Sequence, residues 1–258
     1  MKQKTKATVI SQREIAENIF DMWIETGFAL QSGAGQFIGV YPKDKSRLLP
    51  RPISICQTEK GTRPALRIVY RTVGGGTEEF STYKEGDSID ILGNLGNGFP
   101  LEAAKGKRVF IIGGGIGVPP MLELSEQLRE CEKQIILGYR DCALFLKEEF
   151  ERNGMVYIAT EDGSAGTRGN VLDAIKANGL SADVIYACGP MPMLRAIKMY
   201  AEEKGIDAYI SLEEHMACGV GACLGCVVKT ANVDRHSHVN NARICTDGPV
   251  FEAKEVDI

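Results

Sequence analysis

The first part of the chain alternates between short apolar segments and turn residues. Segments rich in β-branched and aromatic side chains stand at QFIGVYP (36–42), LRIVYR (66–71) and DSIDILG (87–93), with glycine and proline between them. Short strands separated by such turns are typical of antiparallel sheets that close into a barrel or stack as a sandwich. We therefore predict an antiparallel barrel or sandwich over residues 1–102.

From Lys107 onward, the pattern changes to an alternation of strands and helices. Continuous apolar runs predict buried strands at 108–113, 134–140, 155–160, 184–189 and 207–212. Helical patterns lie between them, near 119–130, 144–152, 170–178 and 191–204. In the last of these, one helical face carries Met193, Leu194, Ile197, Tyr200 and Ala201. This alternation predicts a parallel, doubly wound sheet over residues 103–212.

The overall composition excludes several classes of protein. The formal net charge of −4 gives no basic surface for nucleic acid, and no apolar run approaches the roughly 20 residues of a membrane span. The N-terminal MKQKTKATVI is basic but lacks the apolar core of a secretory signal. We therefore predict a cytoplasmic protein, in which clustered thiols bind metal or carry out redox chemistry instead of forming disulfides.

The last segment, residues 213–258, is rich in glycine and cysteine and shows little periodicity. We expect a small third domain there, ordered by something other than a large apolar core. Its cysteines have the spacing C-x4-C-x2-C with one more downstream: Cys218, Cys223, Cys226 and Cys245. This is the plant-type [2Fe–2S] ligand spacing, and small residues between the cysteines would let the loop wrap a cluster closely. A zinc knuckle is the alternative, although zinc sites favour paired C-x2-C motifs and only one is present.

The three histidines and the remaining cysteines give weaker signals. A Rieske-type site would need two histidines, but four cysteines already suffice, so we take His215, His236 and His238 as non-ligands. The polar stretch 232–241 is expected to be a solvated hairpin or loop. Three further cysteines are expected to be small core residues or surface thiols: Cys56, Cys131 and Cys142.

A glycine-rich turn, GGGIGVPP (113–120), follows a predicted strand and precedes a predicted helix. Its glycines would let backbone amides approach a phosphate, although the spacing is not a strict Rossmann fingerprint and a ligand-free turn is the alternative. TEDGS (160–164) and CGPMPM (188–193) follow other strands. Because ligands of open α/β sheets bind beyond the carboxyl ends of the strands, the three segments together predict a nucleotide site. Cys188 is either a contact near a nicotinamide ring or a small packing residue.

A nicotinamide site and a one-electron cluster in one chain need a flavin to convert between two-electron and one-electron transfer. RPIS (51–54) resembles the flavin-binding motif of the ferredoxin–NADP reductase superfamily, which joins an antiparallel flavin barrel to a parallel nucleotide domain. The resemblance implies that Arg51 pairs with the FAD pyrophosphate and that Ser54 lies near the isoalloxazine. It also implies further flavin contacts, namely Pro52, Ile53, Ile68, Val69, Tyr70, Gly75, Gly76 and Thr77. The nicotinamide nucleotide would be flanked by Gly113, Gly114, Gly115, Gly117, Gly189 and Pro190.

The order of these motifs, with the cysteines last, resembles the electron transfer subunits of NAD-dependent dihydroorotate dehydrogenase over nearly the whole chain. The resemblance implies FAD, a [2Fe–2S] cluster and NAD as cofactors, and a role in pyrimidine (UMP) biosynthesis. It further implies a partner, the FMN-containing catalytic subunit, in a heterotetramer with two copies of each. Alternatives of the same architecture are a subunit of a ferredoxin–NAD(P) or sulfide-linked oxidoreductase, and a stand-alone reductase. A non-enzymatic redox sensor or zinc-bound module is the alternative from another class.

Overall fold

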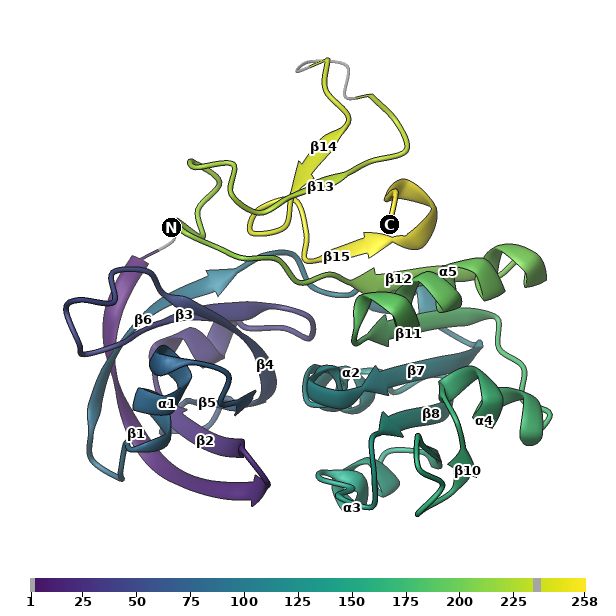
Figure 1. Ribbon diagram of the computed structural model, residues 1–258, viewed down its shortest axis with the longest axis horizontal. Helices are drawn as coiled ribbons and strands as arrows, with labels where there is room; N and C mark the ends of the chain where they lie inside the picture. The colour runs from purple at the N-terminus through teal and green to yellow at the C-terminus, as the bar shows by residue number, and fades with distance from the viewer. Residues whose placement is uncertain (1–2, 234–237) are drawn as a thin grey trace.

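The computed structural model describes residues 3–233 and 238–258. Figure 1 shows a β-barrel on one side, an α/β sheet beside it, and a smaller C-terminal lobe that lies across the top of both. Among the described residues, no helix is long and apolar enough to cross a membrane.

The N-terminal part forms a closed antiparallel barrel, which decides between the predicted barrel and sandwich. Its strand order is β1-β2-β5-β4-β3-β6. The bounds are β1 (Gln3–Ala16), β2 (Ile19–Glu25), β3 (Phe37–Tyr41), β4 (Arg51–Glu59), β5 (Ala65–Arg71) and β6 (Ser88–Leu95). Helix α1 (Gly75–Ser81) follows β5, and a short 3-10 turn, η1 (Gly27–Gln31), follows β2.

The second part is the predicted doubly wound sheet, with the order β10-β9-β8-β7-β11-β12-β15. Its strands are β7 (Arg108–Gly114), β8 (Glu132–Tyr139), β9 (Met155–Thr160), β10 (Thr167–Arg168), β11 (Val184–Cys188), β12 (Asp207–Ser211) and β15 (Val250–Glu252). The helices are α2 (Pro120–Gln127), α3 (Lys147–Glu151), α4 (Val171–Ala177) and α5 (Met191–Lys204). All neighbouring strands are parallel except β15, which runs antiparallel to β12.

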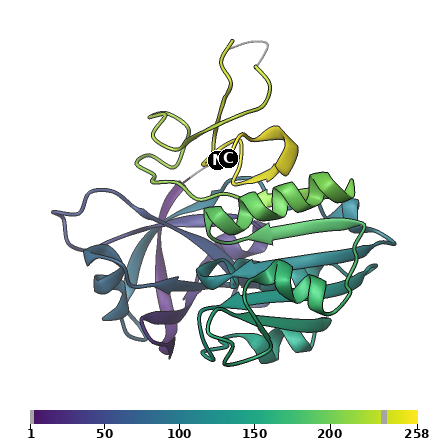
Figure 2. The same cartoon turned by 45° about the vertical axis from the view of Figure 1, so that its right-hand side comes forward.

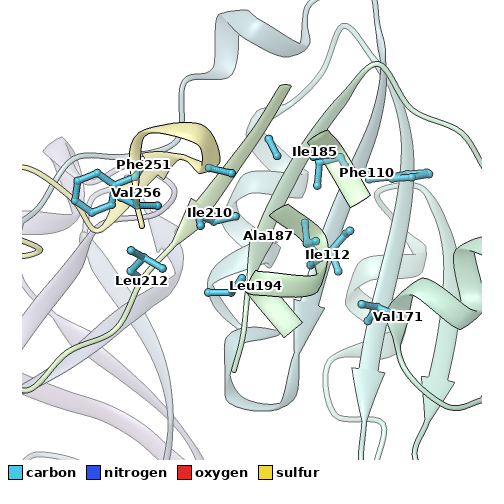
Figure 3. Packing of buried hydrophobic residues seen from close by; sticks show 14 of the residues in the cluster. Phe110, Ile112, Val171, Ile185, Ala187, Leu194, Ile210, Leu212, Phe251 and Val256 are labelled. Carbon is cyan, nitrogen blue, oxygen red and sulfur yellow. The ribbon is translucent and has the colours of Figure 1, made fainter. Parts of the chain in front are cut away.

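Strand β7 shows why the strands of this sheet read as continuous apolar runs. Val109 and Ile111 pack in one cluster with residues of α2 and α3. Phe110 and Ile112 pack on the opposite face, in a cluster with residues of α4 and α5 (Figure 3). Because both faces are covered by helices, every residue of β7 after Arg108 is buried, whichever way its side chain points.

The C-terminal segment shares the apolar core of the sheet, contrary to our expectation that something other than such a core orders it. A two-stranded sheet of β13 (Val227–Lys229) and β14 (Asn241–Arg243) projects from the molecule, while β15 extends the large sheet beyond β12. Phe251 and Val256 lie beside Ile210 and Leu212 of the β12 region in Figure 3. Figure 2 shows the lobe resting on both the barrel and the sheet. The division of the chain at residues 102 and 212 stays a prediction.

A buried ion pair lies where the barrel meets the sheet. The Arg67 guanidinium of β5 donates from Nε to Asp21 Oδ1 at 2.8 Å and from Nη2 to Asp21 Oδ2 at 2.9 Å. The same Nη2 lies 3.4 Å from Glu149 of α3. Both partners of the main pair are almost fully buried, at 5% and 3% side-chain exposure. Arg67 therefore links two barrel strands to a helix of the α/β sheet.

We expect Arg67→Met to destabilise the protein by about 3–5 kcal/mol, because it leaves the buried Asp21 carboxylate with only the exposed Arg13, 3.4 Å away, as a cationic partner. Denaturant unfolding followed by circular dichroism measures the effect. Arg63→Met is the matched control, because the Arg63–Glu25 pair is exposed and its loss should change stability little. Equal effects of the two substitutions would contradict the role assigned to Arg67.

Candidate functional site

The glycine-bearing segments predicted from sequence come together at one edge of the sheet. Gly113 of β7 pairs in register with Cys188 of β11, and Gly114 pairs with Gly138 of β8. Further along the edge, Tyr139 of β8 pairs with Thr160 of β9, the residue that opens TEDGS. The carboxyl ends of four adjacent parallel strands thus present GGGIG, the end of β8, TEDGS and CGP side by side, which is where open α/β sheets bind ligands.

Gly117 allows the first of these turns to lie directly against the last. A Cβ atom on Gly117 would stand 2.5 Å from the carbonyl oxygen of Cys188 and 2.6 Å from the backbone nitrogen of Gly189. Real Cβ atoms do not approach backbone this closely, so only glycine permits the contact. Gly115 has a positive φ of 54° in the turn η3 (Gly115–Gly117), a conformation that glycine adopts without strain.

Cys188 is buried at this edge, with 1% exposure. Burial raises the pKa of its thiol, and the negative charge of Glu213 adds to this effect. The thiol therefore stays protonated and is not a nucleophile at neutral pH. Its placement in the core cluster favours the packing interpretation, while a contact with the nicotinamide ring stays a prediction.

The RPIS motif forms the start of β4, and its Ile53 side chain packs against the barrel core. Arg51, Pro52, Ile53 and Ser54 are all half-buried, so a ligand can reach them. The Arg51 side chain crosses the first turn of α1, where a Cβ on Gly76 would lie 2.6 Å from its Nε. Its Nη1 donates to the carbonyl of Leu49 at 2.6 Å. The predicted Gly75, Gly76 and Thr77 therefore lie beside Arg51.

Arg47 is a second guanidinium at the same place, and the sequence reasoning missed it. It donates to the carbonyl of Gly75, and its Nη1 lies 3.5 Å from Glu79 Oε2. Two guanidinium groups over a run of glycines fit a pyrophosphate, because each can donate two parallel hydrogen bonds to phosphate oxygens. The sequence feature that could have indicated Arg47 is the presence of a second arginine in the loop before RPIS.

Two of the other residues predicted to contact the flavin have side chains that point into the barrel core. The side chains of Ile68 and Tyr70 belong to the barrel core, and the Tyr70 hydroxyl donates to Gln12 Oε1 at 2.8 Å. Val69 points the other way, into the cluster that faces α2. Contact of Ile68 and Tyr70 with a flavin stays a prediction, and their side-chain directions do not favour it.

The four predicted cluster ligands lie in two pairs. Hydrogen bonding joins Cys218 to Cys223 and Cys226 to Cys245. Among the described residues, no three His, Cys, Asp or Glu side chains are placed to hold a single metal ion. Two thiol pairs suit a [2Fe–2S] cluster, in which each iron takes two protein thiolates, better than they suit one zinc ion with four ligands. The assignment of these four residues as ligands stays a prediction.

Backbone amides surround the sulfur of Cys218. The amides of Val220 and Ala222 donate to it at 3.4 and 3.3 Å. Although burial opposes the shift, these bonds and those from Cys223 lower the pKa of Cys218 to about 6. The backbone makes this turn through Gly219 and Gly221, with positive φ values of 66° and 86°. A loop that stabilises thiolate in this way has the chemistry that a cluster requires.

The two cysteine pairs differ in burial. Cys226 and Cys245 are buried at 3% and 1% exposure, in the core cluster that also holds Leu92 and Leu95 of β6. Burial, followed by the bond from Cys226, raises the pKa of Cys245 to about 11. Cys223 is exposed and Cys218 half-buried. One side of the candidate cluster site therefore faces the barrel, and the other faces solvent.

The structure also describes three further cysteines and two of the three histidines. Cys56 is buried, Cys131 half-buried and Cys142 exposed, as expected for core and surface thiols. His215 and His238 belong to no cluster of potential metal ligands within the described residues. His236, with part of the stretch 232–241, lies outside those residues.

The fold and these sites define a class of protein: a reductase of the ferredoxin–NADP reductase superfamily with an added iron–sulfur domain. Residues 213–257 match the family model described as the iron–sulfur cluster binding domain of dihydroorotate dehydrogenase B. A chain of the NADH-dependent reduced ferredoxin–NADP oxidoreductase is similar in structure, with TM-score 0.86 and 28% identity over 97% of this chain and 89% of that one. A ferredoxin–NADP+ reductase from Neisseria gonorrhoeae shares the fold at 17% identity and TM-score 0.66, over 83% and 95% of the two chains.

Sequence relatives narrow the class to one family. The electron transfer subunit of dihydroorotate dehydrogenase B (NAD+) from Geobacillus sp. (strain WCH70) is 42% identical, over 99% of both chains. The subunit of the same name from Streptococcus mutans is 44% identical, over 98% of both chains. The chain belongs to the family of dihydroorotate dehydrogenase B (NAD+) electron transfer subunits.

We expect Arg51→Ala to weaken flavin retention roughly tenfold or more, because it removes a charge-assisted hydrogen-bond donor. Flavin content after gel filtration and the FAD dissociation constant measure the effect. The FAD affinity of Arg51→Lys should be intermediate, because lysine keeps the charge but cannot donate two parallel hydrogen bonds to phosphate. Arg63→Ala, an exposed arginine outside the site, is the control. Unchanged flavin binding in Arg51→Ala would count against the motif's role.

Gly117→Ala should push the GGGIG turn away from the end of β11, because its Cβ would overlap the Cys188 carbonyl. We expect a stability loss of about 1–3 kcal/mol and weaker binding of NADH. Gly61→Ala is the control, since nothing lies within 4 Å of its Cβ position. Wild-type NADH affinity in Gly117→Ala would show that the turn does not shape the nucleotide site.

Proposed function

We propose that this chain is the electron transfer subunit of an NAD-dependent dihydroorotate dehydrogenase of pyrimidine (UMP) biosynthesis. Electrons released by dihydroorotate oxidation on a partner subunit would reach NAD+ through this chain. The observation that carries the proposal is the juxtaposition of the paired cysteines with the barrel that bears RPIS and the sheet that bears the glycine turns. The full-length similarity to relatives of that name supports it.

The proposed cofactors are FAD, a [2Fe–2S] cluster and NAD. When bound, the cluster handles single electrons, the nicotinamide takes a hydride, and the flavin converts between the two. Arg51 and Arg47 would bind the FAD pyrophosphate, and the four cysteines would hold the cluster. The turns at Gly117 and Gly189 would hold the nicotinamide nucleotide at the strand ends. The protein's contribution is then to set distance, orientation and electrostatic environment.

The proposed partner is the FMN-containing catalytic subunit, with two copies of each chain in the complex. The cluster loop offers it an apolar, exposed surface, on which Val220 is 42% and Leu224 63% exposed beside Cys223. A partner that covered these side chains would also reach the solvent-facing side of the cluster site. A cytoplasmic location is proposed because a reducing compartment keeps clustered cysteines available as cluster ligands.

A second candidate is a subunit of a ferredoxin–NAD(P) oxidoreductase. The similarity in structure to the NADH-dependent reduced ferredoxin–NADP oxidoreductase favours it. That similarity rests on 28% identity, against 42–44% for the dihydroorotate dehydrogenase relatives. The first candidate is therefore preferred.

The deciding experiment uses the chain purified without oxygen, together with the partner it retains. Dihydroorotate is added and the visible spectrum is followed. We expect bleaching of flavin and cluster absorbance that NAD+ reverses. Bleaching by NADH but not by dihydroorotate, with the partner present, would reject the first candidate in favour of the second.

In the same assay, Cys223→Ser should abolish the cluster absorbance and dihydroorotate-driven NAD+ reduction. Flavin content should remain near wild type, because the flavin motif lies in the barrel. Cys142→Ser, at an exposed cysteine outside the predicted ligand set, should keep the cluster absorbance of the wild type. Full coupled turnover by a cluster-free Cys223→Ser protein would refute the proposed route.

A further inference from the structure

Arg243, the last residue of β14, connects two separate parts of the cluster loop. Its Nε and Nη2 donate to the two carboxylate oxygens of Asp247 at 3.1 and 3.3 Å, and its backbone amide donates to the same carboxylate at 2.8 Å. The third guanidinium nitrogen, Nη1, donates to the carbonyl of Gly221 at 3.2 Å. Arg243 therefore joins the segment around Cys245 to the turn between Cys218 and Cys223.

The peptide group that Arg243 contacts also faces a predicted cluster ligand. The Gly221 carbonyl and the Ala222 amide belong to one peptide unit, and that amide donates to Cys218 Sγ at 3.3 Å. A donor on the carbonyl oxygen polarises the peptide and strengthens its N–H as a donor to sulfur. The guanidinium, the peptide and the thiolate thus form a short chain of hydrogen bonds.

The peptide group on the N-terminal side of Gly221 contacts the other cysteine pair. The amide of Gly221 hydrogen bonds to Cys245, so Gly221 contacts both pairs through its two neighbouring peptides. The position cannot carry a side chain without strain, since its φ is +86° and a Cβ would lie 2.8 Å from the Thr246 methyl group. The Arg243 guanidinium is the cation in contact with this glycine.

We propose that Arg243 is a positioning residue that holds the Gly221–Ala222 peptide toward the cluster and raises the cluster's reduction potential. Reduction adds one negative charge to the cluster. A fixed guanidinium and an aligned N–H both favour that charged state. Asp247 orients the guanidinium and offsets part of its charge, so the two residues act on the potential with opposite signs.

The sign of each effect separates this role from a merely structural one. Arg243→Gln leaves Asp247 unneutralised, so it should lower the potential. Asp247→Asn leaves Arg243 unneutralised, so it should raise the potential. The double variant has no net change in charge, so only the loss of the Arg243–Gly221 hydrogen bond should lower its potential, by less than in Arg243→Gln. We expect each single change to shift the ratio of reduced to oxidised cluster roughly tenfold at fixed potential, about 59 mV for a one-electron couple.

The measurement is a reductive titration of the anaerobic full-length chain, with the cluster signal followed by electron paramagnetic resonance. Iron and sulfide content are determined on each sample, and Arg243→Lys, which keeps the charge, should shift the ratio less than Arg243→Gln. Shifts of the same sign in Arg243→Gln and Asp247→Asn, or no shift in cluster-loaded samples, would overturn the proposal. If Arg243→Gln holds no cluster, Asp247→Asn alone decides, and a potential at or below wild type overturns it.

The inference rests on the cluster of the proposed function but not on its substrate, since the titration uses a chemical reductant. Failure of the two ideas is therefore distinguishable. A wild-type chain that cannot be loaded with iron and sulfide would refute the cluster itself. A loaded chain whose variants shift in the wrong direction refutes only the role of Arg243.

Discussion

The hydrogen bonds between β12 and β15 hold the cysteine-rich segment on the same sheet that carries the nucleotide turns. Tyr209, Ile210 and Ser211 pair with Glu252, Phe251 and Val250. Electron transfer between cofactors depends on short, fixed separations, so a cluster domain on a loose tether could not serve this chain. With β15 as part of the sheet, Cys245 stands only five residues from a strand in a large apolar core.

The barrel is tied to the same segment by the end of β6. The Asn97 side-chain amide donates to the carbonyls of Thr246 and Asp247 at 3.1 and 2.9 Å, and its backbone amide donates to Gly248 at 2.7 Å. Phe37, in register with Ser54 of RPIS, lies in the cluster that also contains Cys226 and Cys245. The strand that pairs with the flavin motif therefore contributes a side chain to the apolar core around the inner cysteine pair.

Much of this arrangement was predictable from sequence, because the strongest signals are local. The strands of the sheet follow continuous apolar runs, and α5 occupies 191–204 as its periodicity indicated. Strand β1 was missed because its apolar residues are diluted by exposed polar ones over its fourteen residues. The contacts of Arg47 and Arg243 were not predictable, because both side chains donate to backbone carbonyls, which every residue has whatever its type. The C-terminal segment packs into the core of the sheet through tertiary contacts, which no local sequence pattern predicts.

Strand β15 has a second consequence, for the behaviour of the sheet as a surface. At the other edge of the sheet, β10 is only two residues long and offers little backbone for a foreign strand to pair with. If β15 were absent, β12 would be the edge strand on this side, and its outward-facing amides and carbonyls would be unpaired. By pairing with β12, the cysteine-rich segment prevents this edge of the nucleotide domain from pairing with a strand of another chain. A shortened chain that ended after β12 would keep the flavin and nucleotide motifs but expose a template for aggregation.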